Sequence, residues 1–403
     1  MFLEDSMLPV ELPLPSADAL AHSTRLVALL RETIAARGPM PFHAFMERCL
    51  YAPGLGYYSA GARKFGAAGD FVTSAELGPI FARCVAGALA PSLLLLGAQA
   101  DWLELGGGSG VFAEHLLLAL AARDALPTRY LMLEPSAELR ARQQARLRER
   151  LPAALFARLK WIERPPEQPW RGVLFANEVL DALPATRFTV RGGEVYEEHV
   201  ALDGAGGFMR VDRPADALTS AAVRHLERAL GQSFADGYRS ELLPQMPYWM
   251  QAVAGALQAG LALFIDYGYP RAEYYLPQRA NGTLRAFYRH RMHADVFFHP
   301  GLQDLTASVD FSALAEAGRG AGLELAAYVP QGQFLLAAGL EQVHAEAATG
   351  LDAAGLYALA QEIKRLMLPE AMGERFQAML FARGLAAAAL PAELLLADRR
   401  ARL

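Results

Sequence analysis

The sequence predicts an α/β protein with a Rossmann-like, mostly parallel sheet that is covered by helices. Between residues 101 and 266, short apolar segments alternate with segments whose apolar residues recur at helical spacing. A glycine-rich turn directly follows the first apolar segment. Such an alternation places parallel strands in one sheet and helices on both of its faces. The 403 residues, 53% of them hydrophobic and 20% charged, are enough for one large domain with added elements.

The elements before the sheet are predicted to be helical. Three prolines favour an extended arm over residues 1–17, and apolar residues at helical spacing predict a helix over 18–37. Shorter helices are expected over 41–50 and 77–90, on either side of a loop that is rich in glycine and aromatic residues.

The sheet itself is predicted from five strands and the segments between them. The strands are expected over residues 101–105, 130–134, 159–163, 172–177 and 261–266. Helices are expected over 111–123 and 137–150. Residues 188–201 are predicted to form a hairpin that turns at 191–193, and 215–258 a mainly helical insertion before the fifth strand.

The last part of the chain is predicted to close the sheet. A helix over 311–321 precedes strands over 323–329 and 333–338. The short link between these strands, which contains Pro330, allows only a hairpin, so the two strands are expected to be antiparallel. Residues 343–403 are predicted to be helical and carry no recognisable chemistry.

Composition and charge exclude several classes of protein. The formal net charge of −5 gives no general attraction to phosphate backbones, so a nucleic-acid partner is not expected. Two cysteines, Cys49 and Cys84, cannot form a disulfide framework or a four-cysteine zinc site. The first residues lack the basic region and apolar core of a signal peptide, and the longest aliphatic run, 93–96, is too short to span a bilayer. We therefore expect a cytoplasmic protein without membrane insertion.

The glycine-rich turn E-L-G-G-G-S-G at residues 104–110 is the first candidate binding site. Gly106, Gly108 and Gly110 let a bulky cofactor approach the backbone closely, because a Cβ at these positions would block it. The helix that follows supplies N–H groups for a carboxylate or a phosphate. The turn also matches the dinucleotide pattern G-x-G-x-x-A, so a NAD enzyme and a purely structural turn both stay open.

Two acidic residues bear on the choice of cofactor. Glu104 precedes the first glycine by two places, and the resulting pattern E-x-G-x-G-x-G is typical of methyltransferases. Glu134 closes the second strand and places a carboxylate where ribose hydroxyls are expected, which suits either cofactor. We therefore predict S-adenosyl-L-methionine as the cofactor, bound by these two glutamates and the three glycines.

Four further stretches resemble one known family. They are L-Y-A-P-G-L-G-Y-Y-S at 50–59 with G-D-F-V-T-S-A-E at 69–76, L-E-P-S at 133–136, F-A-N-E-V-L-D-A-L-P at 175–184, and I-D-Y-G at 265–268 continued by G-T-L-R-A-F-Y-R-H at 282–290 and D-L-T-A-S-V-D-F at 304–311. In this order they are similar to the MidA-like proteins, which include mitochondrial complex I assembly methyltransferases. Ala75 and Ser308 depart from the family pattern, which has a proline and a histidine at these places.

The resemblance implies a class I S-adenosylmethionine-dependent methyltransferase, whose parallel sheet is closed by an antiparallel hairpin. The studied eukaryotic members methylate an arginine of a respiratory-complex subunit, so a protein substrate is expected. Residues 1–100 would form a helical extension with a cofactor-covering loop, 101–342 the methyltransferase domain with an insertion at about 186–258, and 343–403 a C-terminal helical segment.

Asn177, Glu178 and Asp181 lie where the fourth strand ends, and open parallel sheets bind ligands at that edge. A guanidinium stays protonated near neutral pH, so carboxylates must hold it and offset the charge that develops during methyl transfer. The segment also resembles the acidic loop of protein arginine methyltransferases. Glu178 and Asp181 are therefore the predicted catalytic residues, and Asn177 is assigned to the cofactor. Alternatively, Asp181 caps a helix, Glu178 is merely exposed and Asn177 closes the strand.

Four other residues complete the predicted site. Asp70 and Thr73 lie on the glycine-rich loop, from which they could fold over the cofactor. Asp266 and Tyr267 end the fifth strand at the same edge of the sheet and are predicted to contact the substrate. An exposed loop for the first pair, and ordinary packing for Tyr267, are the alternatives.

His290, His293 and His299 lack the spacing and the cysteine neighbours of a zinc site, so no metal is expected. Their loop is predicted to line the substrate channel or to pack against the sheet. Besides arginine methylation, three functions stay open: methyl transfer to another protein or a small molecule, a S-adenosylmethionine-binding assembly factor for a respiratory complex, and a NAD enzyme.

Overall fold

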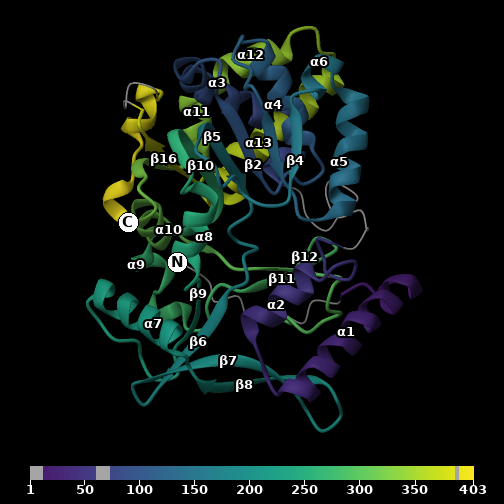
Figure 1. Cartoon of the computed structure of the whole chain (residues 1–403), viewed down its shortest axis with the longest axis vertical. Helices are drawn as coiled ribbons and strands as arrows, with labels where there is room; N and C mark the ends of the chain where they lie inside the picture. Colours follow the sequence, from purple (N-terminus) through teal and green to yellow (C-terminus); the bar gives the residue numbers. More distant parts are fainter. Residues whose placement is uncertain (1–11, 60–72, 386–389) are drawn as a thin grey trace. The chain divides into compact units, whose positions relative to one another are not determined.

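Two compact units make up the chain, each assembled from three separate stretches of sequence (Figure 1). The structure is a computed structural model that describes residues 12–59, 73–385 and 390–403. The N-terminal unit comprises Met1–Val72, Ala182–Pro244 and Tyr275–Ser308, and the sheet unit comprises Thr73–Asp181, Gln245–Tyr274 and Val309–Leu403. This division differs from the expected one, because residues 343–403 belong to the sheet unit and two internal stretches join the N-terminal segment.

The sheet unit contains most of the predicted α/β fold. Its strands are β2 (Asp101–Leu105), β3 (Tyr130–Leu133), β4 (Leu159–Ile162), β5 (Trp170–Asn177), β10 (Leu257–Tyr269), β14 (Val309–Asp310), β15 (Glu324–Pro330) and β16 (Phe376–Arg383). Its helices are α3 (Pro79–Leu96), α4 (Val111–Ala121), α5 (Ala137–Arg150), α6 (Ala153–Phe156), α8 (Met246–Ala254), α9 (Arg271–Tyr274), α10 (Phe311–Gly320), α11 (Gln331–Ala337), α12 (Leu340–Ala348) and α13 (Ala353–Met367). Shorter helical turns are η1 (Ser74–Glu76), η3 (Pro369–Gly373), η5 (Ala392–Leu396) and η6 (Arg400–Arg402).

The central sheet of the described residues runs in the order β15-β16-β10-β5-β2-β3-β4. β10, β5, β2, β3 and β4 are parallel to one another, and β14 forms a short parallel pair with β10. β16 is antiparallel to both of its neighbours. The predicted α/β class, a mainly parallel sheet that ends in antiparallel strands, is therefore confirmed.

Two glycines allow β5 to lie close to both of its neighbours. Gly172 on β5 has φ +146°, and a Cβ there would lie 1.8 Å from the backbone oxygen of Asp101 on β2. Gly260 on β10 has φ +147°, and its Cβ would lie 1.8 Å from the backbone oxygen of Gly172. Any other residue at either place would force these strands apart.

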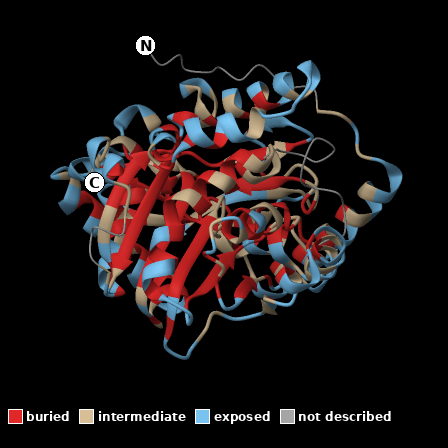
Figure 2. Cartoon of the chain, turned by 90° about the horizontal axis from the view of Figure 1, so that it is seen from above, coloured by how far each residue is buried: buried red, intermediate tan, exposed pale blue. Residues whose placement is uncertain are grey.

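Helices cover both faces of the central sheet, and β10 shows why. Leu261, Leu263 and Ile265 pack in one apolar core with residues of α3 and α4. Phe264 points to the other face and meets Trp249 of α8, with the ring centroids 6.1 Å apart. Successive side chains of a strand point to opposite faces, so the middle of β10, residues 261–265, is apolar on both faces. Figure 2 shows the result: the strands are buried, and the outer sides of many helices are exposed.

Helix α3 is a core helix of the sheet unit. By length and hydropathy it is the one helix of the described residues that could cross a membrane, and 67% of it is buried inside the protein. Its first turn is held by a carboxylate, because Oε1 of Glu362 on α13 accepts a hydrogen bond from the N–H of Ile80 at 2.7 Å. Gly78 leaves room for this contact, since a Cβ there would lie 2.1 Å from Oε2 of Glu362.

Two predictions for the last part of the chain are wrong. Residues 333–337 belong to helix α11, with Ala338 as its C-cap, and not to a strand, because this alanine- and leucine-containing segment suits a helix and Pro330 precedes its first turn. The strand that pairs with β15 is β16, which lies in the stretch 343–403 that was expected to be wholly helical. β15 and β16 are antiparallel, but three helices separate them along the chain, so they do not form the expected hairpin.

The N-terminal unit contains a second sheet and a small third one. Its helices are α1 (Ala17–Arg37), α2 (Phe42–Tyr51) and α7 (Ala217–Leu230), with the short turn η2 (Pro277–Arg279). Its strands are β1 (Met40–Pro41), β6 (Thr186–Arg191), β7 (Glu194–Leu202), β8 (Phe208–Pro214), β9 (Arg239–Leu242), β11 (Arg285–Tyr288), β12 (Arg291–His293) and β13 (Asp304–Thr306). The larger sheet has the order β1-β7-β6-β9 with β8 on β7, and the smaller one has the order β12-β11-β13.

The hairpin predicted over residues 188–201 is confirmed as β6 and β7. A buried ion-pair network holds this hairpin to the neighbouring strand β9 and to the segment before β11. Arg187 on β6 lies between two buried carboxylates, Glu198 at 3.2 Å and Glu241 at 3.1 Å. Glu241 on β9 also accepts a hydrogen bond from the backbone N–H of Thr283 at 2.8 Å. Charges at this depth are tolerated when they are paired, so the network ties β6, β7 and β9 to the segment before β11.

Candidate active site

The carboxyl ends of four parallel strands meet at one edge of the central sheet. Leu105 on β2 pairs with Leu133 on β3 and with Ala176 on β5. Asn177 on β5 pairs with Ile265 on β10. β2, β3 and β5 end in register, and β10 passes the same edge before it ends at Tyr269, so the turns after β2, β3 and β5 lie beside one another and beside residues 266–269 of β10. This is the edge at which the sequence predicts the cofactor and the methyl acceptor.

The turn between β2 and α4 is a cradle that only glycine can form. Gly106, Gly108 and Gly110 have φ of +65°, +52° and +86°, a backbone conformation that favours glycine. At Gly107, which the prediction did not single out, a Cβ would lie 2.4 Å from Cε of Met132. An α-helix begins with N–H groups that have no partner within the helix, so the start of α4 suits an anionic group.

Glu104 lies beneath this turn. Its side chain is 3% exposed, and Oε2 accepts a hydrogen bond from the hydroxyl of Tyr130 at 2.9 Å. Burial raises the pKa of Glu104 to about 8, and the nearby charge of Glu134 adds to the shift. In the absence of a ligand the carboxyl group is therefore largely protonated at neutral pH.

Glu134 follows β3 and faces the same turn. It is 6% exposed; Oε1 accepts a hydrogen bond from the N–H of Ser136 at 2.9 Å and Oε2 one from Nε2 of Gln143 at 3.4 Å. Gln143 also donates to the backbone oxygen of Gly108 at 2.9 Å. Burial raises the pKa of Glu134. Gln143 was missed in the sequence, although it occupies the inward face of α5 one turn before the buried Leu147.

The loop after β5 holds Glu178 in a left-handed backbone conformation, with φ +53°. Its Oε1 accepts hydrogen bonds from the N–H of Ser74 at 3.0 Å and from Nδ2 of Asn177 at 3.1 Å. A carboxylate only accepts, so these contacts fix the orientation of the Asn177 amide. Asn177 therefore binds Glu178, the residue that is predicted to hold the methyl acceptor. Its role toward the cofactor stays a prediction.

Asp266 lies under that loop. It is 1% exposed; Oδ2 accepts hydrogen bonds from the N–H groups of Leu180 at 2.9 Å and Asp181 at 3.2 Å, and Oδ1 accepts one from Tyr267 at 2.8 Å. Burial, and then the charges of Asp181 and Glu178, raise the pKa of Asp266 well above its ordinary value. Its contacts are thus with the backbone of the acidic loop, whereas the sequence analysis assigned it to the substrate.

Tyr267 and Thr73 are placed at the borders of this region. Tyr267 is half-buried, and its ring meets Phe376 of β16 edge-on, with centroids 5.4 Å apart. Thr73 is buried and directly precedes η1. Asp70 lies outside the described residues. The substrate and cofactor roles of these residues stay predictions.

The turn η1 contributes three contacts that the sequence analysis did not predict. The hydroxyl of Ser109, in the middle of the glycine turn, donates a hydrogen bond to Oε1 of Glu76. The N–H of Ser74 is the donor to Glu178 described above, and its hydroxyl donates to Oε1 of Gln331 at 3.2 Å. Ser74 and Glu76 belong to the motif at 69–76, which was the available signal for them.

The three histidines lie in the N-terminal unit. His290 and His299 have φ of +63° and +38°, and His293 is buried with its ring 5.6 Å from that of Phe298. Burial lowers the pKa of His293 and His299, which favours their neutral form. Over the described ranges, the structure brings together no group of three or more His, Cys, Asp or Glu side chains that could hold a metal.

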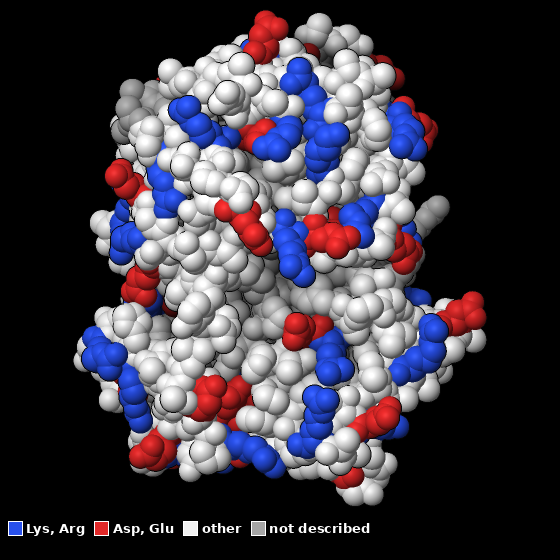
Figure 3. Space-filling model, viewed as in Figure 1, with Lys and Arg blue, Asp and Glu red and all other residues white. Residues whose placement is uncertain are grey.

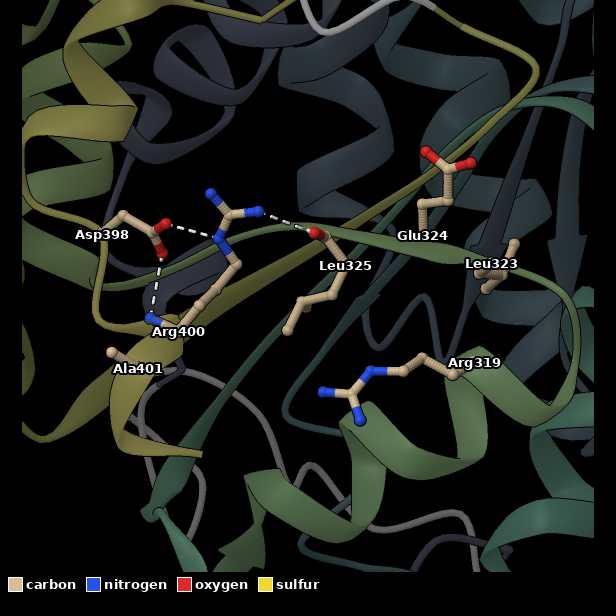
Figure 4. A pocket seen from close by; sticks show the side chains of 7 residues that line it. All are labelled: Arg319, Leu323, Glu324, Leu325, Asp398, Arg400 and Ala401. Atoms are coloured by element: carbon tan, nitrogen blue, oxygen red, sulfur yellow. Dashed lines mark hydrogen bonds and ion pairs between the residues drawn. The ribbon is translucent and has the colours of Figure 1, made fainter.

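A surface depression of about 680 Å³ lies elsewhere in the sheet unit, beside the edge strand β15. It is lined by Arg319, Leu323, Glu324, Leu325, Asp398, Arg400 and Ala401 (Figure 4). The C-terminal residues cover this edge: the N–H of Arg399 donates to the oxygen of Tyr328 at 2.7 Å, and Arg400 to that of Leu325 at 2.9 Å. None of the predicted site residues lines it, so it is explained by the capping of an edge strand.

Basic and acidic side chains are mixed on the face of the described residues that Figure 3 shows. This distribution agrees with the small net charge of −5.

Comparison with known proteins identifies the family. Residues 84–329 match the family described as "Putative S-adenosyl-L-methionine-dependent methyltransferase". The chain belongs to this family. A solved structure of a Burkholderia thailandensis protein bound to S-adenosyl-homocysteine is 42% identical to this chain, with a TM-score of 0.88 over 97% of this chain and 100% of that one. A native structure from the same organism is 41% identical, with a TM-score of 0.85 over the same shares.

Curated relatives from animals are more distant. The Drosophila melanogaster protein named "Protein arginine methyltransferase NDUFAF7 homolog, mitochondrial" is 28% identical over 95% of this chain and 90% of its own length. The Mus musculus protein named "Protein arginine methyltransferase NDUFAF7, mitochondrial" is 26% identical over 90% of this chain and 86% of its own. Together these findings confirm the MidA-like resemblance. The protein is a S-adenosylmethionine-dependent methyltransferase, which makes the NAD enzyme the wrong alternative.

The expectation of a cytoplasmic protein is wrong by the same comparison. The relatives from Drosophila melanogaster, Caenorhabditis elegans and Mus musculus are all named as mitochondrial proteins. The expectation rested on the lack of a secretory signal and of a long aliphatic run, and neither feature distinguishes between compartments inside a cell.

Gly108→Val is expected to abolish binding of S-adenosylhomocysteine while the protein stays folded. Position 108 has φ +52°, which a β-branched residue rarely adopts, and the new side chain would enter the cradle. Isothermal titration calorimetry measures the loss, and circular dichroism checks the fold. Binding of NAD by the wild type, without any response to S-adenosylhomocysteine, would contradict the cofactor assignment.

Glu134→Ala is expected to weaken the affinity for S-adenosylhomocysteine by about 1–3 kcal/mol, the range for losing a charged hydrogen-bond acceptor. The same titration measures it. Glu138→Ala is the control: this glutamate lies in the first turn of α5 and pairs with Arg142 at 2.7 Å, so the affinity should not change. An unchanged dissociation constant in Glu134→Ala would show that its carboxylate does not contact the cofactor.

Glu104→Gln is expected to make the ligand-free protein less sensitive to alkaline pH. The pKa of Glu104 is about 8 in the folded protein against an ordinary value of 4.5, so the folded state binds the extra proton between these values. The free energy of unfolding therefore falls as the pH rises through this range. Glutamine keeps an acceptor for Tyr130 and cannot ionise. The free energy of unfolding of Glu104→Gln relative to wild type should therefore increase by a few kcal/mol as the pH rises through this range, at about 1.4 kcal/mol per pKa unit.

Urea unfolding of both proteins at about pH 5 and about pH 9 measures this difference. A free-energy difference that stays constant between the two pH values would show that Glu104 is ionised throughout the range.

Proposed function

We propose that the protein transfers a methyl group from S-adenosylmethionine to an arginine side chain of a protein substrate. The observation that carries the proposal is the group of three carboxyl side chains formed by Glu178 and Asp181 in the loop after β5 and by Asp266 on β10, which is bonded to that loop. Their charges oppose one another. Carboxylates held this close together are stabilised by a cation, and a guanidinium offers several N–H donors at once. The names of the animal relatives, which are protein arginine methyltransferases, support the same acceptor.

The cofactor supplies an activated methyl group, and the chain's own residues prepare the acceptor. A guanidinium cannot be deprotonated near neutral pH, so it must be held as a cation with one nitrogen directed at the methyl carbon. Glu178 and Asp181 would accept hydrogen bonds from its other N–H groups and offset the developing charge. Asp266 would act indirectly, because its oxygens are bonded to three backbone N–H groups of the loop and of β10.

The substrate can be identified in the host. Mass spectrometry of the proteome with and without the gene should show one protein whose arginine is methylated only when the gene is present, and purified enzyme should restore that methyl group in a knockout extract. A methyl group that appears on another type of residue, or on a small molecule, would contradict the arginine acceptor. Unchanged methylation would favour a binding factor without turnover.

Glu178→Gln is expected to reduce single-turnover methylation of the identified substrate at least about 100-fold, with nearly unchanged affinity for S-adenosylhomocysteine. The carbonyl oxygen of glutamine can still accept the N–H groups of Ser74 and Asn177, so the variant removes the charge and keeps the loop. Asp181→Asn serves as the milder companion variant. Full activity of Glu178→Gln would favour a neutral acceptor that needs no carboxylate.

A further inference from the structure

We propose that the turn η1 couples the cofactor turn to the acceptor loop, with Glu76 as a positioning residue. The coupling concerns contacts within the sheet unit alone. Its importance for catalysis rests on the proposed function, because that proposal makes Glu178 the residue that holds the acceptor. The coupling itself can be measured without any acceptor.

One end of the connection is in the glycine turn. Ser109 stands between the two glycines of lowest and highest φ, and its hydroxyl donates to Oε1 of Glu76. The same hydroxyl oxygen accepts a hydrogen bond from the N–H of Val111, the first residue of α4, at 3.4 Å. Glu76 therefore holds the middle of the cradle and the first residue of the helix behind it.

The other end is the acidic loop. The N–H of Ser74 donates to Oε1 of Glu178 at 3.0 Å. Glu178 has φ +53°, a conformation that costs a non-glycine residue energy and persists only where its surroundings impose it. The hydrogen bonds from Ser74 and Asn177 hold the side chain of Glu178 in one position.

The turn η1, which connects the glycine turn to the acidic loop, is short and well anchored. Ser74 and Glu76 lie in one helical turn, which is closed by the hydrogen bond from the N–H of Glu76 to the oxygen of Thr73 at 3.0 Å. Ser74 is fully buried, and its hydroxyl is bonded to Gln331, which is also buried. Because these hydrogen bonds anchor η1, the turn moves as a unit. A displacement of Ser109 is therefore passed on to Glu178 through an unbroken series of contacts.

Coupling of this kind is reciprocal. A ligand that orders the glycine turn favours the position of Glu178 that suits the acceptor. By the same coupling, loss of the contact between Ser74 and Glu178 lowers the affinity of the glycine turn for its ligand. The prediction concerns two side chains that need not touch the cofactor themselves. Glu178 then has two separate roles: its Oε1 binds the N–H of Ser74 in η1, and its negative charge binds the methyl acceptor.

The test is a double-mutant cycle on the affinity for S-adenosylhomocysteine, measured by calorimetry in the full-length protein. Glu76→Ala should weaken binding about tenfold, and Ser109→Ala should do the same, since each removes one hydrogen bond to a charged group. Glu178→Ala should weaken binding about threefold on its own. In the Glu76→Ala background it should have no further effect, because the connection is already broken.

Two variants control for indirect effects. Glu178→Gln keeps an oxygen for the N–H of Ser74 and should bind like wild type, which a general loss of structure would not restore. Glu316→Ala removes a carboxylate of α10 that pairs with Arg271 at 2.6 Å, and it should leave the affinity within about twofold. Melting temperatures identify any variant that fails to fold, and Ser109→Ala then replaces Glu76→Ala in the cycle.

The proposal is overturned if the effects of Glu76→Ala and Glu178→Ala multiply, because Glu178 would then act on the cofactor independently of η1. It is also overturned if Glu178→Ala binds like wild type. Neither result bears on the acceptor. Conversely, a failure to methylate arginine would leave a measured coupling intact, so the two proposals fail separately.

Discussion

The buried carboxyl group of Asp266 is the interaction on which the candidate site depends. It lies on the central strand β10, three residues before the strand ends at Tyr269, and accepts hydrogen bonds from the backbone of the loop that follows β5. Without it, two N–H groups of that loop would be buried with no acceptor, at about 1–3 kcal/mol each. The same contact keeps three acidic side chains together, so their mutual repulsion is built into the fold. A cation that binds beside them relieves this repulsion, and a neutral ligand does not.

The sequence predicts the parts of this fold that depend on local information. β2 and α5 have the predicted bounds, because alternating apolar segments, glycine turns and helix caps are all encoded within a few residues. Ser136, for example, caps α5 through its side chain, which accepts from the N–H of Leu139. The edge that carries the site follows from the same information, since parallel strands that alternate with helices bring their carboxyl ends together.

The parts that were mispredicted depend on distant partners. Residues 376–383 contain alanine, methionine and leucine, which favour a helix, yet they form β16 because β10 and β15 pair with both of its sides. The support that Asp266 gives to the acidic loop could not be predicted for a similar reason, since two of its three hydrogen-bond donors lie more than eighty residues away in the chain. A carboxylate at a strand end looks the same in the sequence whether it faces a ligand or supports a loop. Only the donors around it decide between the two.

The positions at which the chain enters and leaves the sheet unit explain why the site is built here. The chain enters this unit at Thr73 and first leaves it after Asp181. Ser74 and Glu178, which share a hydrogen bond, stand next to these two points. That bond therefore fixes the distance between an incoming and an outgoing segment, in the sheet unit itself. Loops on a rigid sheet carry function because the scaffold fixes their ends. Here the hydrogen bond from the N–H of Ser74 to the carboxylate of Glu178 fixes the incoming and the outgoing segment against each other.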